Sequence, residues 1–200
     1  MTHILAIDTS TDACSVGLYS SADTLQEDFE ICPAQHTEKV LSQINRLLEA
    51  AGLSLPQIDA IAFGQGPGSF TGVRIAASVA QALGFGLNKP LIPVSTLRAI
   101  AQEAFIEKGH RQVAVMIDAR LGAVYWGLYR LNAKDIMEAV HPDQVGPQAS
   151  VIIPDPSWVS VTAQYPHARE VARIGAYAYS QGDVVTAVDA VPVYVRDKVV

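Results

Sequence analysis

The chain has 200 residues, half of them apolar, which is enough to bury a sizeable core in one domain of two lobes or in two small domains. Its net charge of −6 excludes a broad basic face, so a nucleic-acid substrate would have to be held mainly by another chain. Cys14 and Cys32 lack the spacing of a zinc or redox motif and are too few for a disulfide framework. We interpret both cysteines as packing residues.

The first ten residues, MTHILAIDTS, carry no basic leader, and their apolar run ends at Asp8. No signal peptide is therefore predicted, and the cytoplasm is the expected location. The longest apolar stretch, about 71–94, is interrupted by Arg74, Gln81, Asn88 and Lys89. It is predicted to be a buried helix and strand, without membrane contact.

The first predicted element is a β-hairpin that occurs twice. The stretch AIDTSTDACSVGLY (6–19) aligns without a gap with MIDARLGAVYWGLY (116–129). Each copy is predicted to be a strand that ends in Asp, a tight turn, and a second strand that returns beside the first. A chance similarity of two short apolar hairpins is the alternative. The repeat predicts two lobes built on one plan, residues 1–106 and 107–200.

The later elements alternate between helix and strand. Residues 36–52 place Val40, Leu41, Ile44, Leu47 and Leu48 on one helical face, with Gly52 as the stop. Further predicted elements are a strand at 58–64, a glycine loop followed by a helix at about 71–85, a strand at 90–95 and a helix at 167–182. This order predicts an α/β fold with a mixed sheet in each lobe.

The stretch AFGQGPGSFTGVRIAASVAQALG (62–84) raises the question of a phosphate site, because a glycine turn that opens a helix can bind an anion. It fails the GxxxxGK[ST], GxGxxG and GxSxG patterns, since the required lysine, third glycine or first glycine is absent. The alternative is that its glycines only let two backbones approach each other. The candidate cofactor-binding residues are Asp8, Thr9, Gly66, Gly68 and Ser69.

Asp8 and Asp118 each end the first strand of a repeat. Two lobes that face one cleft would bring these carboxylates together to hold a metal or the Mg²⁺ of a nucleotide. The alternative, which we favour for Asp118, is that each aspartate caps its turn through its own backbone. The histidines show no HxxxH or HExxH spacing, and no Ser/His/Asp pattern rises above chance, so neither a metal site nor a nucleophilic site is predicted.

The helix after the glycine loop has a ridge of small residues, Gly72, Ala76, Ala80 and Gly84. Such a ridge permits close packing against another helix, either helix 36–51 of this chain or a helix of a partner. Because the other faces are also largely apolar, the helix is predicted to be central to the core or half covered by a partner chain. The predicted interface consists of Leu41, Ile44, Leu48, Gly72, Val73, Ala76, Val79, Ala80 and Leu83.

Six stretches, in order, resemble the bacterial TsaB (YeaZ) family: ILAIDTSTDACSVGLY, HTEKVLSQINRLL, AFGQGPGSFTGVRIAASVAQALG, IPVSTL, IDARLGAVYWGLY and PVYVRDKV. They cover nearly the whole chain, and the GPGSFTGVRI block is specific. The resemblance implies a duplicated actin-like, Hsp70-like and sugar-kinase-like (RNase H-like) fold. Between Val161 and His167 the family has a longer, glycine-containing segment, so either the second lobe is shortened or residues are absent from the sequence.

The resemblance also implies a role in making N6-threonylcarbamoyladenosine next to the anticodon of tRNAs that read codons starting with A. The implied partners are the catalytic subunit TsaD and the ATPase TsaE, with tRNA contacted only through the complex. Helices 36–51 and 71–85 would dock on their counterparts in TsaD or in a second copy, so the isolated chain would be a homodimer. No cofactor of its own is implied, although ATP or ADP would fit at the interface of the complex.

The family of the catalytic partner has IPVHHMEGH where this chain has IPVSTLRAI. The two metal-binding histidines of HMEGH align with Thr96 and Ile100, neither of which can replace them. The resemblance thus implies a non-catalytic scaffold. The alternatives are a peptidase that acts on its TsaD-like partner, an ATP-dependent phosphotransferase that uses Asp8 and the glycine loop, or a self-sufficient homodimer with an unrelated binding role.

Overall fold

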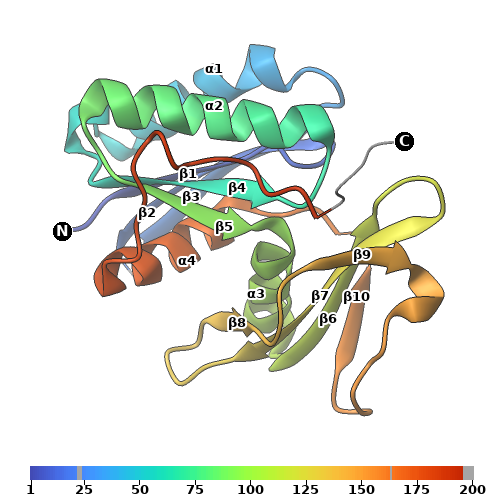
Figure 1. Ribbon diagram of the computed structural model, residues 1–200. Coiled ribbons are helices and arrows are strands. Elements are labelled where there is room, and N and C mark those ends of the chain that lie inside the picture. The colour runs from blue at the N-terminus through green and yellow to red at the C-terminus, as the bar shows by residue number, and fades with distance from the viewer. Residues whose placement is uncertain (22–23, 163, 196–200) are drawn as a thin grey trace.

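The computed structural model describes residues 1–21, 24–162 and 164–195, which form two lobes, each built around one β-sheet (Figure 1). In the first sheet, β1, β2 and β3 form an antiparallel meander, and β4 and β5 continue it parallel to β1. The strand order is β3-β2-β1-β4-β5. The bounds are β1 Ile4–Asp8, β2 Ala13–Ser21, β3 Thr24–Ile31, β4 Ala60–Gly66 and β5 Leu91–Ser95.

Three helices cover the two faces of the first sheet. Helices α1 (His36–Ala51) and α2 (Phe70–Leu87) lie on one face, and α4 (Ala168–Gln181) lies on the other (Figure 1). Since both faces are covered, β1 is buried along its whole length, which explains its unbroken apolar run. The edge strand β3 is only partly buried, which agrees with its largely polar sequence, TLQEDFEI.

The second sheet repeats the first in order and direction. Its strands are β6 (Gln112–Asp118), β7 (Ala123–Leu131), β8 (Met137–Ala139), β9 (Gln144–Pro147) and β10 (Val159–Thr162). The order β10-β6-β7-β8 matches β4-β1-β2-β3, with antiparallel and parallel pairs at the same places, and β9 also pairs with β7. The predicted α/β fold of two duplicated lobes is confirmed.

Two helices exchange lobes. Helix α3 (Thr96–Lys108) follows β5 but packs on β6 and β7 of the second sheet, whereas α4 follows β10 and packs on β1 and β2 of the first. The other face of the second sheet is covered by residues 140–158, which contribute Trp158 to a small core around Trp126. The division between residues 106 and 107 stays a prediction. Most of α3 comes before this division but packs in the second lobe, and α4 comes after it but packs in the first.

Most predicted elements occur within a few residues of their expected ends. Helix α1 stops at Gly52, whose φ of 66° is left-handed, and α4 stops in the same way at Gly182. Sequence reasoning missed β3, α3, β8, β9 and β10, together with two short 3₁₀-helices, η1 (Leu55–Gln57) and η2 (Gln148–Ser150). Both cysteines are buried free thiols, as predicted.

The chain leaves α4 and returns along α2. In this C-terminal segment, residues 183–195, Val185 bridges to Leu91, and the backbone N–H of Val193 donates to the carbonyl of Gln65 (2.9 Å) (Figure 1, red). The side chain of Gln81 on α2 donates to the carbonyl of Ala190 (3.0 Å). The rest of the PVYVRDKV motif lies outside the described residues, as does residue 163, and the predicted shortening between Val161 and His167 stays a prediction.

Candidate functional site

The glycine loop between β4 and α2 lies directly against the first hairpin turn, residues 8–12. A Cβ on Gly68 would lie 2.3 Å from the carbonyl oxygen of Ser10, and one on Gly72 would lie 1.9 Å from that of Thr9. The hydroxyl of Thr9 donates to the carbonyl of Gly72 (2.7 Å), and the N–H of Ser69 donates to the carbonyl of Ser10 (2.6 Å). The glycines therefore let two backbones of the same chain touch.

Asp8 lies behind this contact and is completely buried. Its Oδ1 accepts from the N–H (2.8 Å) and the hydroxyl (2.7 Å) of Ser10, and the hydroxyl of Thr96 donates to that of Ser10 (3.0 Å). Its Oδ2 faces Gly64 and has no hydrogen-bond partner among the described residues. Burial outweighs the two hydrogen bonds and raises the pKa of the Asp8 carboxyl to about 6.

The second hairpin turn, residues 118–122, is open to solvent. The side chain of Asp118 is 66% exposed, and its Oδ1 accepts from the N–H of Arg120 (2.9 Å). Asp118 thus caps its own turn, as we favoured. The prediction that Asp8 and Asp118 face one cleft as a pair is wrong, because Ser10 and the glycine loop separate Asp8 from the space between the lobes.

A cleft of about 580 Å³ lies between the lobes. It reaches Ser10, Gly68 and Ser69 on one side and Asp118 and Arg120 on the other, and its lining includes four aromatic side chains, Phe70, Tyr125, Tyr165 and Tyr194. Of the candidate cofactor residues, Gly68 and Ser69 line this cleft, whereas Asp8, Thr9 and Gly66 do not. The structure gathers all five candidates around one loop, and cofactor binding by them stays a prediction.

The aligned positions Thr96 and Ile100 lie in α3 and are both fully buried. Thr96 is held by its bond to Ser10, and Ile100 belongs to the apolar core of the second lobe. Within the described ranges, no group of three or more His, Cys, Asp and Glu side chains is placed to hold a metal ion.

A serine, a glutamate and a histidine meet where α4 begins. The hydroxyl of Ser15 donates to Oε1 of Glu27 (2.7 Å), whose Oε2 lies 2.8 Å from Nδ1 of His167. In a nucleophilic triad the histidine lies between the hydroxyl and the carboxylate, whereas here the carboxylate lies between the other two. This contact fixes α4 to β2 and β3 and does not have the geometry of a peptidase site.

The small-residue ridge of α2 packs on the sheet of its own chain. Gly72 meets the turn at Thr9, Gly84 meets Leu91, and Ala76 and Ala80 belong to the core of the first lobe. The prediction that this ridge faces another helix is corrected. Six predicted interface residues are buried within the chain: Ile44, Leu48, Gly72, Val73, Ala76 and Ala80.

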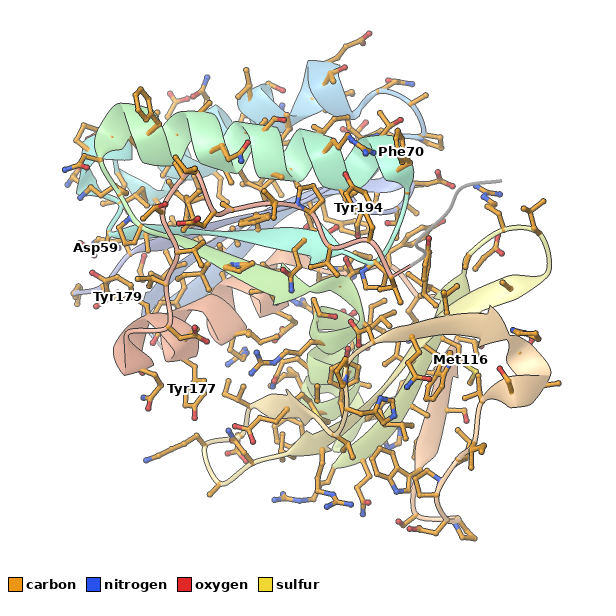
Figure 2. The ribbon with its side chains drawn as sticks, viewed as in Figure 1. Asp59, Phe70, Met116, Tyr177, Tyr179 and Tyr194 are labelled. Atoms are coloured by element: carbon orange, nitrogen blue, oxygen red, sulfur yellow. The ribbon has the colours of Figure 1, made fainter. Side chains whose placement is uncertain are left out.

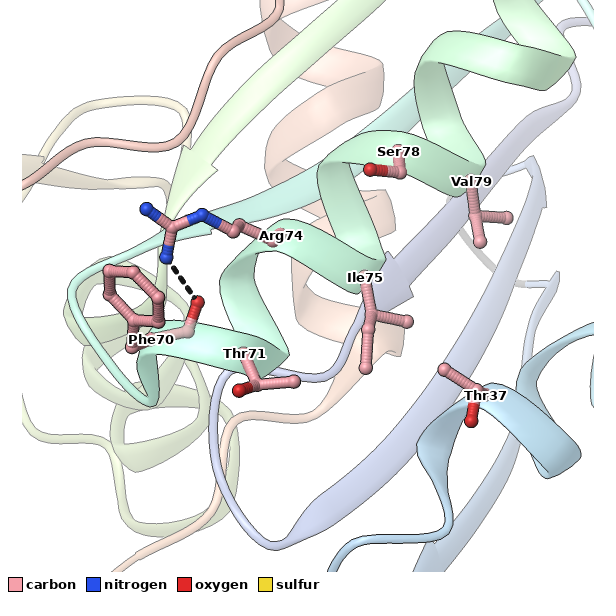
Figure 3. A pocket seen from close by; sticks show the side chains of 7 residues that line it. All are labelled: Thr37, Phe70, Thr71, Arg74, Ile75, Ser78 and Val79. Carbon is pink, nitrogen blue, oxygen red and sulfur yellow. Dashed lines mark hydrogen bonds between the residues drawn. The ribbon is translucent and has the colours of Figure 1, made fainter.

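A groove of about 300 Å³ lies beside the ridge, between α1 and the start of α2 (Figure 3). We call it the helix groove, and it is lined by Thr37, Phe70, Thr71, Arg74, Ile75, Ser78 and Val79. Three predicted interface residues are not buried. Val79 lines the groove and Leu83 is half-buried. Leu41 is 56% exposed and lies one turn of α1 after Thr37. Phe70 and Arg74 were missed, although the sequence shows Arg74 as the single charged residue of α2.

The outer side of α2 is strongly apolar. Phe70 is 58% exposed, Phe85 is 83% exposed, and only 33% of the helix is buried. Length and composition alone would let α2 cross a membrane. In the fold, however, one side of the helix packs on the first sheet, and the other side faces outward (Figure 1).

The sequence matches a family model over residues 29–184, and the family is described as TsaD, tRNA N6-adenosine threonylcarbamoyltransferase. The chain is also similar to the tRNA threonylcarbamoyladenosine biosynthesis protein TsaB of Escherichia coli, with 37% identity over 224 residues that cover 98% of this chain and 96% of the relative. The protein of that name from Haemophilus influenzae is 47% identical over 123 residues, which cover 62% of this chain and 52% of the relative.

Two solved structures share the whole fold. One is described as an uncharacterized protein with similarity to peptidase YEAZ from Pseudomonas aeruginosa. It has a TM-score of 0.93 and 38% sequence identity, and the match covers 98% of this chain and 100% of that structure. The other, YeaZ from Pseudomonas aeruginosa, has a TM-score of 0.92 and 38% identity over 97% of this chain and 100% of its own. Both likenesses extend over the two lobes.

Proposed function

This chain belongs to the TsaB (YeaZ) family of tRNA threonylcarbamoyladenosine biosynthesis proteins, and on that premise we propose that it is a non-catalytic subunit in making N6-threonylcarbamoyladenosine. It binds a TsaD-family enzyme and supports the transfer to the adenosine next to the anticodon of tRNAs that read codons starting with A. The chain holds the enzyme in an active arrangement and contributes no reacting group of its own.

The observation that carries this proposal is the apolar outer side of α2, together with the exposed Leu41 on α1. Phe70, Ser78 and Phe85 lie along one side of α2, and Leu41 extends the same surface on α1. Large exposed apolar side chains that gather on one side of a protein often mark an interface, and burying Phe70, Phe85 and Leu41 against another subunit would release water from them. Thr96 and Ile100 add support, because they fill the core of the chain where the catalytic relatives have metal ligands.

The rest of the proposal concerns the assembly. A TsaE-like ATPase joins the complex, tRNA is bound only through the complex, and the isolated chain pairs with itself through α1 and α2. The net charge of −6 supports the view that other subunits hold the tRNA. ATP or ADP is expected at the interface of the complex and not as a cofactor of this chain. The proposed site of action is the cytoplasm.

The first test is to measure threonylcarbamoyl transfer to tRNA by the TsaD-family enzyme of the same organism, with and without this chain. Transfer should fall strongly when the chain is omitted, and unchanged transfer would refute the proposal. The informative variant is Leu41→Glu, because a charge on this exposed position disturbs docking without entering the core. Its affinity for the enzyme should fall at least about tenfold.

The matched control is Ile152→Glu, which places the same charge on an exposed apolar residue of the second lobe (76%, compared with 56% for Leu41). This variant should bind the enzyme like the unmodified chain. Equal losses for both variants would mean that added charge, and not the position on α1, weakens the complex. Equal binding by both would remove Leu41 from the docking surface.

A further inference from the structure

Arg74 lies at the edge of the helix groove as a cation with no ion-pair partner in the described part of the chain. It is half-buried and is the single charged residue of α2. Among the described residues it makes one hydrogen bond, from Nη1 to the carbonyl of Phe70 (2.7 Å), and takes part in no ion pair (Figure 3). A guanidinium has five N–H donors, so most of its hydrogen-bonding capacity is still open.

Two aromatic rings fix the position of this guanidinium. Its central carbon lies 3.3 Å from the centroid of the Phe70 ring and 4.8 Å from that of Tyr194, and the two rings lie 6.4 Å apart. Figure 2 shows both labelled rings at the same end of α2. Because the rings stack against the cation, Arg74 loses little further side-chain entropy when a partner binds.

The cations of the neighbouring helix differ from Arg74. On α1, Lys39 pairs with Glu30 (2.9 Å) and Arg46 pairs with Asp28 (2.8 Å), both on β3. Carboxylates of the chain thus neutralise both cations of α1, as its overall excess of acidic residues would suggest. Within residues 1–195, apart from the gaps at 22–23 and 163, no carboxylate pairs with Arg74, and the other residues that line its groove are apolar or neutral.

A partner that covers the helix groove must deal with this charge. Removing a guanidinium from water without an anion costs several kcal/mol, whereas a carboxylate can accept two parallel hydrogen bonds from its edge. A purely apolar helix would therefore bind weakly at this position. An apolar helix with one Asp or Glu placed against Arg74 would bind more tightly.

We propose that Arg74 is the specificity-determining residue of the helix groove, and that the TsaD-family enzyme places a carboxylate against its guanidinium when it docks. Phe70 and Tyr194 hold the guanidinium ready for this contact. Since Tyr194 belongs to the C-terminal segment, that segment is part of the docking site. The inference rests on the proposed function, because it names the chemistry by which the proposed partner is recognised.

The test measures binding of the TsaD-family enzyme by calorimetry at low and high salt. Arg74→Met removes the charge and keeps an apolar stem over the Phe70 ring. It should weaken binding at least about tenfold and reduce the salt dependence, while Arg74→Lys should restore part of the affinity. The matched control, Arg46→Met, removes a cation that its own chain already neutralises, and it should bind like the unmodified chain.

Tyr194→Leu should lower the affinity by about threefold through looser positioning of Arg74, and Tyr194→Phe should restore it. Equal or tighter binding by Arg74→Met, or an unchanged salt dependence, would overturn the inference. So would a change in self-association without a change in enzyme binding, which would assign the carboxylate to a second copy. If the unmodified chain does not bind the enzyme, the proposed function itself fails, which is a distinguishable result.

Discussion

The turns of the two repeated hairpins lie in opposite environments. In both, a strand ends in an aspartate and its partner strand returns antiparallel to it. Yet Asp8 is completely buried, whereas the side chain of Asp118 is 66% exposed. The sequences differ accordingly, since Thr9 and Ser10 use their hydroxyls against neighbouring groups, and Ala119 and Arg120 stand at the same positions of the second copy.

The cause is the element that follows the parallel strand. In the first lobe, β4 runs into the glycine loop and α2, and this loop closes over the first turn. In the second lobe, the corresponding strand β10 ends at Thr162, and α4 leads back to the first sheet. The second turn therefore has no helix start to pack against. The same strand order therefore surrounds a buried structural contact in one lobe and the rim of a cleft in the other.

The largest expected effect comes from adding one methyl group in α2 where it touches the first turn, compared with one methyl group in the second turn. Gly72→Ala places a Cβ 1.9 Å from the carbonyl oxygen of Thr9, so the backbones must separate, and we expect a loss of about 3 kcal/mol or more in unfolding free energy. Gly122→Ala enters open space and costs only about 1 kcal/mol for its left-handed φ of 75°. Urea unfolding followed by circular dichroism compares them, and equal losses would refute the difference between the turns.

The next effect concerns pH. Because the pKa of folded Asp8 is about 6, above its ordinary value of 3.8, the folded state binds this proton more tightly than the unfolded state. The stabilisation is complete below about pH 4 and is lost as the pH rises through 6, so the difference between the unmodified chain and Asp8→Asn should change by about 3 kcal/mol. Urea unfolding at several pH values measures it. The control is Asp118→Asn, and an identical pH profile for both variants would contradict the role of burial.

The smallest effect comes from removing the hydroxyl of α3 that supports the first turn. Thr96→Val keeps the shape of the side chain but removes the donor to Ser10, and it should cost about 1 kcal/mol of unfolding free energy. Thr96→Ser retains the donor and serves as the control. If the serine variant were destabilised and the valine variant were not, packing of the methyl group would matter at this position and the hydrogen bond would not.

Sequence patterns predicted the lobes well because their signals are local. The repeat correctly predicted both hairpins. Helices α1 and α4 end at Gly52 and Gly182, where the predicted helices end. The missed helix α3 also has local signals, since Ser95 caps its start and Gly109 ends it. Its lobe exchange with α4 depends on contacts between distant residues, which no local pattern contains.

The candidate site was harder to predict, because spacing tells which residues share a helix face but not what that face meets. The ridge from Gly72 to Gly84 was correctly placed on one side of α2, yet its neighbour is the chain's own sheet. Likewise, Asp8 was recognised at a strand end, but its burial depends on Ser10 and Thr96 from elsewhere in the fold. Tyr194 and Arg74 lie 120 residues apart, so only the three-dimensional structure brings them together.

The return of α4 to the first sheet has a consequence during synthesis on the ribosome. The face of that sheet formed by Ile4, Ala62 and Ile92 is closed by Val171 and Ile174, which are made long after the five strands. Until then the growing chain carries an open apolar sheet face, which other chains can contact. The first lobe therefore becomes complete only after the strands of the second lobe have been made.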